Sequence, residues 1–480
     1  MSILDALLEK KPSIRTSSST ALVLLLISLS ISQNLYYENV FGDSSPSYPI
    51  AIKDFTLKYE FGPTFGKIVA GKPLVVSTIL QNDFNIQANA TYFIEVLDEK
   101  GLVESLQSKV VDISNRAPFE ILVSWTPNVL GSHTITGFIW LMNNNNTAIS
   151  LAPKTSINVD VQQELTVKTY TLCADGCDFS DFQKAIDRLH KLENRILVED
   201  GNYELFRPIR VWSHTNLEFS ANAKITYLGP ENTTVFYGNQ VSDIEIVNAQ
   251  ITAVARSGMK AFSFTSSTGI NISGGQVTLI KGEESAGLYC RDCKNVAIVG
   301  LRISNASRLV DIGTISQTND NKSSTIWILN GNYESSSIEG IKVNYSNDVH
   351  IIGNRVSNTS DNAIDIGHNS HSIVMNNRVE NGGVPHGSGI HTDSSIRADI
   401  FGNVLKVTGG QGITVYRASE INIINNTITN AGSVGVAIIS ADEPSSNINV
   451  RYNYIIDSFD SWIYVSANQK NIELSDNIFH

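Results

Sequence analysis

The stretch SDNAIDIGHNSH, residues 360–371, places titratable side chains where a buried β-strand would carry only aliphatic ones. Asp365 stands between two isoleucines, and His368 and His371 follow it closely. An acid beside an imidazole can exchange protons with a bound molecule, because histidine titrates near neutral pH. The same side chains on a wet sheet face would only be solvated, so the interpretation depends on what lies beside this strand.

Histidine is concentrated in this part of the chain. Four of the nine histidines, His368, His371, His386 and His391, fall within 24 consecutive residues. The segments HNSH and HTD, which begin at His368 and His391, contain side chains that bind calcium or transition metals, although nothing in the spacing fixes a geometry. A metal site here is one alternative, and no other cofactor is expected.

Two sequence patterns repeat with one shared period. One asparagine column has intervals of 22 to 27 residues and comprises Asn332, Asn354, Asn377, Asn403, Asn426, Asn453 and Asn477. The second column consists of GIKV, AIDI, GIHT, GITV and GVAI, which begin at Gly340, Ala363, Gly389, Gly412 and Gly435. A shared period indicates a solenoid whose turns stack in register, with an asparagine in left-handed backbone at each corner. The sequence therefore predicts an all-β chain that contains a parallel β-helix.

In each G-I-x-I strand the aliphatic side chains must point into the solenoid, so the residue between them points out. From residue 259 onward this outward column reads Ser263, Tyr289, Asp311, Lys342, Asp365, His391, Thr414, Ala437 and Tyr464. Adjacent coils lie ~4.8 Å apart. Lys342, Asp365 and His391 should therefore touch. We expect Asp311 below this group and Asp393, Tyr416 and Arg417 around its upper edge.

One amphipathic helix is predicted near residues 179–191, where Ser180 and Gln183 have the spacing of a capping box. From Leu172 to the C-terminus the chain resembles the right-handed parallel β-helix, or pectin-lyase-like, superfamily. The residues CADGCDFSDFQKAI resemble its usual opening, in which a helix closes the N-terminal end of the coils, and the asparagine repeats resemble its generic repeat. The resemblance implies this fold but no single reaction.

The superfamily that the chain resembles includes lyases, epimerases and hydrolases of polysaccharides as well as non-catalytic surface proteins. For a uronan lyase or epimerase, His391 would be the base, Asp365 its orienting acid and Tyr416 a proton donor, and Lys342 and Arg417 would neutralise the sugar carboxylate. A glycoside hydrolase would instead pair Asp365 with Asp393 or Asp311. Neither a polygalacturonase Asp-Asp pair nor an alginate epimerase Asp-Pro-His-Glu motif occurs here. A non-enzymatic surface or adhesion scaffold is the rival interpretation.

The N-terminal part divides into three segments. Residues 1–18 carry Lys10, Lys11 and Arg15 and are expected in the cytoplasm, and the apolar residues 19–37 are either a cleaved signal peptide or a transmembrane anchor. Short alternating segments in residues 50–162 predict an antiparallel β-sandwich, and the run SWTPNVLGSHTITGFIW resembles immunoglobulin-like modules. Residues 166–480 form the expected β-helix, outside the cell.

The net charge and the cysteine spacing limit which partners and bonds we expect for this chain. The formal charge is −12, which disfavours nucleic acid and leaves an extracellular polysaccharide as the expected partner. In an exported chain, the spacing favours two local disulfides, Cys173 with Cys177 and Cys290 with Cys293, over a four-thiolate metal site. Nine N-x-S/T triplets are compatible with glycosylation. The final coil at SDNIFH presents an open edge, so a second copy or another partner is expected to cover it.

Overall fold

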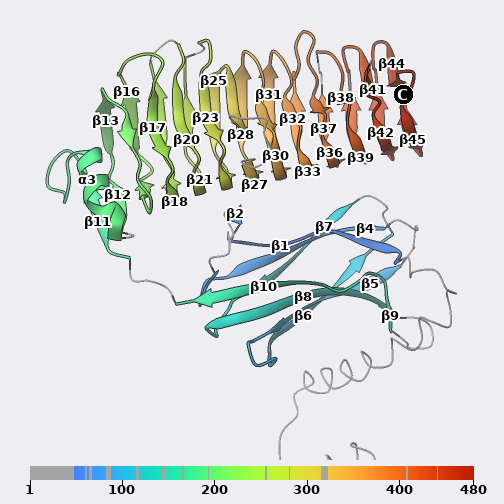
Figure 1. The fold of residues 1–480 in the computed structure, drawn as a ribbon, viewed down its shortest axis with the longest axis horizontal. Helices are drawn as coiled ribbons and strands as arrows, with labels where there is room; N and C mark the ends of the chain where they lie inside the picture. Colours follow the sequence, from blue (N-terminus) through green and yellow to red (C-terminus); the bar gives the residue numbers. More distant parts are fainter. Residues whose placement is uncertain are drawn as a thin grey trace, which may run out of the picture.

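The computed structural model describes residues 48–480 except 60–61, 64–67, 83–87, 115–117, 143–147, 164–166, 193, 255–256, 281, 315–322, 407–408 and 441. Two β-rich parts follow one another along the chain (Figure 1). The segments predicted at residues 1–18 and 19–37 lie outside the described residues. Within the described part, none of the helices has the length and apolar character needed to span a membrane.

The first part is a sandwich of two sheets around one apolar core. Sheet A has the strand order β2 (Gly62–Pro63), β1 (Ile50–Tyr59), β4 (Leu74–Asn82), β7 (Phe119–Trp125). Sheet B has the order β3 (Ile68–Val69), β10 (Thr155–Gln162), β8 (Gly131–Met142), β5 (Asn89–Leu97), β6 (Val103–Asp112), with β9 (Ala148–Ser150) on β8. Its pairs are antiparallel as predicted except β3 with β10, which is parallel, so the antiparallel prediction is wrong for that pair. The immunoglobulin-like relationship stays a prediction.

The second part is a solenoid of three parallel sheets with one continuous apolar core. Sheet C contains β11 (Thr169–Leu172), β12 (Arg195–Val198), β15 (Asn216–Phe219), β18 (Ser242–Val247), β21 (Thr268–Ser273), β24 (Lys294–Val299), β27 (Ser323–Leu329), β30 (Ser346–Ile352), β33 (Ser370–Met375), β36 (Ile396–Phe401), β39 (Ser419–Ile424), β42 (Ser446–Arg451) and β45 (Lys470–Ser475). Sheet D contains β13 (Gly201–Leu205), β16 (Ala223–Tyr227), β19 (Gln250–Ala253), β22 (Gln276–Thr278), β25 (Arg302–Ala306), β28 (Asn332–Ser336), β31 (Arg355–Thr359), β34 (Arg378–Glu380), β37 (Val404–Lys406), β40 (Thr427–Thr429), β43 (Tyr454–Ile456) and β46 (Ile478–Phe479). Sheet E contains β14 (Ile209–Arg210), β17 (Thr234–Asn239), β20 (Lys260–Thr265), β23 (Ala286–Arg291), β26 (Arg308–Gly313), β29 (Ile341–Asn344), β32 (Ile364–Gly367), β35 (Ile390–Asp393), β38 (Ile413–Tyr416), β41 (Val434–Ile439) and β44 (Ser461–Val465).

Helix α3 (Phe182–Leu189), followed by the short 3-10 helix η2 (His190–Leu192), closes the N-terminal end of the solenoid (Figure 1). Its buried face, which includes Phe182 and Ile186, belongs to the solenoid core. The N-cap is Asp181, whose side chain accepts a hydrogen bond from the backbone N–H of Lys184. The capping box predicted at Ser180 is therefore wrong by one residue, because the aspartate satisfies the exposed N–H group instead.

The asparagine ladder is confirmed from Asn354 to Asn477. In a typical step, Asn377 donates from its backbone N–H and side-chain amide to Oδ1 of Asn403, at 2.9 and 3.0 Å. The prediction is wrong for Asn332, which is paired with Arg355, while Gly331 occupies the ladder position. The left-handed corner is also one residue earlier than predicted, because the ladder side chain must turn inward to bond; it lies, for example, at Asn376 with φ 54°.

The outer face of sheet C is covered by sheet A of the sandwich (Figure 1). Ile79 of β4 packs in one apolar cluster with Ile373, Met375, Phe401 and Ile424, all of which point out of the solenoid. Strand β4 is buried along almost its whole length, as expected when both faces of a strand are covered. This contact between the two parts was not among the predictions from sequence.

Candidate functional site on sheet E

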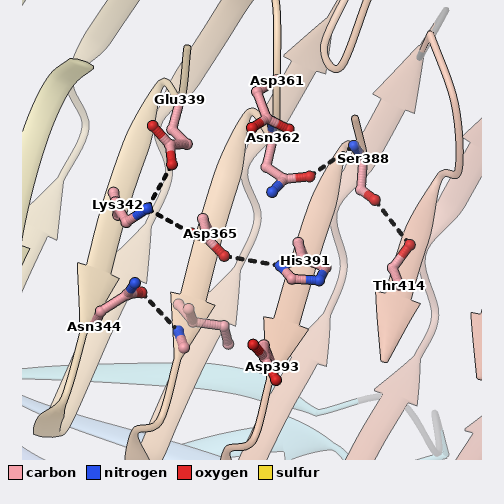
Figure 2. Close-up of polar contacts among 12 residues, drawn as sticks. Glu339, Lys342, Asn344, Asp361, Asn362, Asp365, Ser388, His391, Asp393 and Thr414 are labelled. Carbon is pink, nitrogen blue, oxygen red and sulfur yellow. Dashed lines mark hydrogen bonds and ion pairs between the residues drawn. The ribbon is translucent and has the colours of Figure 1, made fainter. Parts of the chain in front are cut away.

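The outward column of sheet E has the predicted register. The structure pairs each predicted member with the next, in the order Ser263, Tyr289, Asp311, Lys342, Asp365, His391, Thr414, Ala437 and Tyr464. The flanking aliphatic residues, such as Ile364 and Ile366, are fully buried in the core. Side chains that are remote in sequence therefore become neighbours on one face of the solenoid, as Figure 2 shows for its central part.

Asp365 is the centre of this face. Its Oδ1 accepts a hydrogen bond from Nδ1 of His391 at 2.9 Å, and its Oδ2 lies 3.5 Å from Nζ of Lys342 (Figure 2). The Asp365 residue is only 6% exposed, whereas the Lys342 and His391 side chains are 24% and 22% exposed. The acid is thus held beneath a cation and an imidazole, both of which reach solvent.

A chain of alternating charges continues from this centre toward the N-terminal coils. Lys342 lies 2.5 Å from Oε1 of Glu339, whose Oε2 accepts a hydrogen bond from Nε of Arg308 at 2.7 Å. Arg308 is 3.9 Å from Asp311, which lies 2.8 Å from Arg291. The full order along the axis is Arg291, Asp311, Arg308, Glu339, Lys342, Asp365 and His391. Each charge is compensated by neighbours of opposite sign.

These contacts set the protonation of the central pair. Burial alone would raise the pKa of Asp365, but its hydrogen bond and charge interaction with His391, and then Lys342, lower that pKa overall. Burial alone would lower the pKa of His391, but the hydrogen bond and charge of Asp365 raise it above 6.5. The pKa of Lys342 is raised, because the Glu339 hydrogen bond and the charge of Asp365 outweigh burial. Asp365 is therefore ionised and Lys342 protonated at neutral pH.

The predicted upper edge forms a second group. Asp393 is paired in register with Tyr416, and Nη2 of Arg417 lies 3.3 Å from Oδ1 of Asp393. The guanidinium of Arg417 also lies over the ring of Tyr416, 4.5 Å from its centre. Asp393 raises the pKa of His391 through its charge, as a lesser cause after burial and Asp365. The two groups are thus electrostatically connected, and Asp393 links them.

The four histidines of residues 368–391 do not converge. His391 belongs to sheet E, while His368 stacks on Tyr345 with ring centres 4.3 Å apart. His371 lies 3.3 Å from Asp348 beside sheet C, and His386 is exposed in a loop. Over the part of the chain that the structure describes, no three His, Cys, Asp or Glu side chains are grouped so as to hold a metal ion. The cysteines form the two local disulfides, Cys173–Cys177 and Cys290–Cys293.

The sequence analysis missed the acid and the two arginines that extend the face. Glu339 lies just before the GIKV strand, and its side chain is 5% exposed. Arg291 and Arg308 lie at the C-terminal end of β23 and the N-terminal end of β26. The position of Glu339 directly before a recurring Gly-Ile strand could have indicated that this acid lies on the face, but only the residues between the aliphatics were predicted to lie there.

One family model matches part of the chain. The model described as "Periplasmic copper-binding protein (NosD)" matches residues 215–409, which is less than half of the chain. The match spans the coils from β15 to β37. It ends before the part of the solenoid that carries Tyr416 and Arg417. A comparison with curated proteins finds no significant match in sequence.

Solved structures resemble the solenoid. The surface adhesin PfbA of Streptococcus pneumoniae is 15% identical, with a TM-score of 0.50, and the match covers 62% of this chain and 85% of the adhesin. A mannuronan C-5 epimerase A-module from Azotobacter vinelandii is 10% identical, with a TM-score of 0.41 and coverage of 62% and 94%. Tailspike protein 3 of bacteriophage CBA120 is 13% identical, with a TM-score of 0.41 and coverage of 62% and 54%. The strand order and the similarity to the adhesin show that the second part of the chain has the fold of a right-handed parallel β-helix.

Proposed function

We propose that the protein is exported and acts on an extracellular polysaccharide along sheet E, with Asp365 and His391 as its proton-transfer pair. The observation that carries this proposal is the contact of Lys342, Asp365 and His391 on one partly exposed face. Two disulfides support an exported protein, because such bonds persist outside the cytoplasm. Residues 19–37 are the segment that would direct export, as a signal peptide or an anchor.

The chemistry follows from the orientation of the imidazole. Because Nδ1 of His391 donates to Asp365, Nε2 is the nitrogen that can exchange a proton with a bound sugar. In a uronan, removal of the proton at C5 leaves charge on the adjacent carboxylate, which a cation must stabilise. Lys342 supplies that cation on one side of Asp365, and Arg417 lies at the upper edge of the same face. This arrangement supports β-elimination or epimerisation better than hydrolysis, because Asp365 already serves His391.

The raised pKa of His391 sets the condition for this role. A base must be unprotonated, so His391 would take the C5 proton efficiently only above its raised pKa. Below that pH it is a cation that can bind a sugar carboxylate or give a proton to a leaving oxygen. We therefore expect turnover to increase from mildly acidic to mildly alkaline solution.

A non-enzymatic surface scaffold is the second candidate. This candidate is supported by the ion pairs along sheet E. Because each charge on this face already has a partner of opposite sign, the face can be an ordinary solvated surface of the solenoid. The described adhesin PfbA has a similar fold, but at 15% identity that similarity bears on architecture alone.

Incubation with a panel of uronans in heavy water tests the enzymatic proposal. Deuterium at C5, read by NMR, reports epimerisation, in which C5 is reprotonated from the solvent. β-Elimination leaves no hydrogen at C5 and is followed instead by the ultraviolet absorbance of the C4=C5 double bond. His391→Gln should abolish whichever signal the wild type gives, and His386→Gln, a change to an exposed loop histidine, should leave it intact. If the wild type gives neither signal on any uronan but still binds one, the scaffold is the correct function.

A further inference from the structure

The contact between the sandwich and sheet C contains a cluster of acids and imidazoles that the sheet E site does not use. His350 of β30 lies in the interface, with its side chain only 2% exposed. Its Nε2 is 2.9 Å from Oδ1 of Asp348, and its Nδ1 is 4.0 Å from Oδ2 of Asp54 in β1 of the sandwich. His371 of β33 approaches the same Asp348 oxygen at 3.3 Å. Two parts of the chain therefore meet through titratable groups.

The orientation of the His350 ring is fixed. Stacking on Trp327, with ring centres 3.9 Å apart and planes 2° apart, holds the plane of the ring. The contact of Nε2 with Asp348 then selects which edge of the ring faces Asp54. Since Nε2 donates to Asp348, the neutral ring presents the lone pair of Nδ1 toward the Asp54 carboxylate. Among the residues that the structure describes, this buried Nδ1 atom has no hydrogen-bond partner. A lone pair that faces a carboxylate in a buried interface is unfavourable, and one added proton would make the contact attractive.

The other groups around this contact have different roles. Burial is the largest cause that raises the pKa of Asp54, with the charge of Asp348 adding to it, and the charges of His350 and His371 act in the opposite direction. The pKa of His371 is raised mainly by its hydrogen bond to Asp348, with smaller contributions from the charges of Asp399 and Asp54. His350 and His371 in turn hold the pKa of Asp348 below its usual range, despite burial. Asp348 thus stays ionised between the two imidazoles. For Asp54, burial outweighs the charges of those imidazoles and the hydrogen bond from the backbone N–H of Phe55, so its pKa is raised.

We propose that the interdomain contact takes up one proton between Oδ2 of Asp54 and Nδ1 of His350, so that the sandwich docks on sheet C more tightly in mildly acidic than in alkaline solution. The apolar cluster around Ile79 provides the constant part of the docking energy. The Asp54–His350 contact provides the part that depends on pH. The proposal stands whether or not sheet E is catalytic.

The sign follows from linkage. A group whose pKa is raised on docking binds its proton more tightly in the docked state, so docking is strongest below the ordinary pKa of an exposed aspartate. That extra stability is lost as the pH rises through the raised pKa of the docked state. One linked proton changes the docking constant by at most about tenfold per pH unit.

The same coil connects this contact to the sheet E site. Asp365 lies in β32 of sheet E, and His371 lies in the next strand, β33 of sheet C. Between them His368, with φ 54°, stacks on Tyr345 of the preceding coil at the corner of the solenoid. The surface on which the sandwich docks is therefore separated from the Asp365–His391 pair by one corner of the solenoid.

Labels on the two domains of the full chain test the proposal. All four cysteines are in disulfides, so cysteines introduced at Val110 of β6 and Val404 of β37, which are 68% and 37% exposed, can carry spin labels. The distance between the labels is followed during urea titrations from about pH 5 to about pH 8. The urea midpoint for separation should fall with rising pH in the wild-type background. In Asp54→Asn it should change much less with pH and stay high at alkaline pH.

Asp160→Asn is the matched control, because it removes an exposed acid on β10 of the opposite sheet. It should reproduce the pH dependence of the wild type. Asp54→Ser removes the same charge with a smaller side chain and should repeat the result of Asp54→Asn, which guards against a folding defect in either variant. A wild-type midpoint that is independent of pH, or an equal pH dependence in wild type and both Asp54 variants, overturns the proposal.

Discussion

Nδ1 of His391 lies 2.9 Å from Oδ1 of Asp365, although 26 residues separate the two in the chain. The contact exists because their strands, β32 and β35, are adjacent in one parallel sheet and put both side chains on its outer face. A carboxylate on Nδ1 fixes the tautomer of the ring and directs Nε2 away from the acid. The pair therefore exists only through the coil-on-coil register, and its geometry is what supports the proposed proton transfer.

The first prediction concerns the protonation of His391. Asp365→Asn should lower the pKa of His391 relative to wild type, because the charge that offsets its burial is removed. Histidine-labelled NMR titration measures this directly. If His391 is the catalytic base, the rising limb of the pH profile for C5 deuteration should move to lower pH in the variant. Asp98→Asn, at a half-buried position of the sandwich just before a turn, is the control, and an equal His391 pKa in all three proteins would contradict the assigned contact.

The second prediction concerns Glu339, the nearly buried acid between Arg308 and Lys342. Glu339→Gln leaves those two cations less compensated, so a negatively charged glycan should bind this face more tightly, by about three- to tenfold at low salt. Calorimetric titration with a uronan measures the change, which should shrink as salt is added. Glu380→Gln, an acid of sheet D that contacts Arg355 and Arg378, changes the net charge equally and should have little effect. Equal affinity in the two variants would remove sheet E as the binding face.

The register of sheet E was predictable from sequence because it depends on one local rule. A side chain between two core aliphatics must point outward, and a shared repeat period then places successive outward residues side by side. Neither step needs knowledge of the rest of the molecule. The asparagine column shows the limit of spacing as a guide. Asn332 precedes Asn354 by an interval close to those of the other repeats, but it is offset by one residue. Only the hydrogen bonds show that Gly331 holds the ladder position.

The sequence contains a pattern that indicates a covered face on sheet C, although no docking of the sandwich was predicted from it. Along the outer face of sheet C, one column begins with polar and apolar residues in alternation, Glu218, Val247 and Ser273, and is polar again at Arg451. Between them the column reads Val299, Leu329, Ile352, Met375, Phe401 and Ile424. A run of outward aliphatics indicates that something covers the sheet. The sequence could therefore show that a partner exists, but the identity of that partner depends on contacts such as that with Ile79, which no local rule provides.

The third prediction concerns the asparagine ladder. Asn403→Ala should lower the free energy of unfolding by about 2–4 kcal/mol, because it leaves the buried amide groups of Asn377 and the carbonyl of Val374 without their partners. Urea unfolding followed by circular dichroism gives the value. Asn202→Ala, on an exposed position of β13, should change stability by less than about 0.5 kcal/mol. Similar losses in the two variants would show that the ladder does not stabilise the solenoid.

The fourth prediction tests the interdomain surface itself, separately from its pH dependence. Phe401 is 3% exposed and packs with Ile79 of the sandwich, so Phe401→Ala should weaken docking by about 2–4 kcal/mol while the solenoid core, on the other side of the strand, stays intact. Small-angle scattering of the full chain should then show a more extended molecule, and a dye that binds apolar surface should fluoresce more strongly. Val404→Ala lies three residues further on, at an exposed position of β37, and should match the wild type in both measurements. Were the two variants equally compact, the outward aliphatics of sheet C would need another explanation, because a sheet face that water reaches gains nothing from a phenylalanine there.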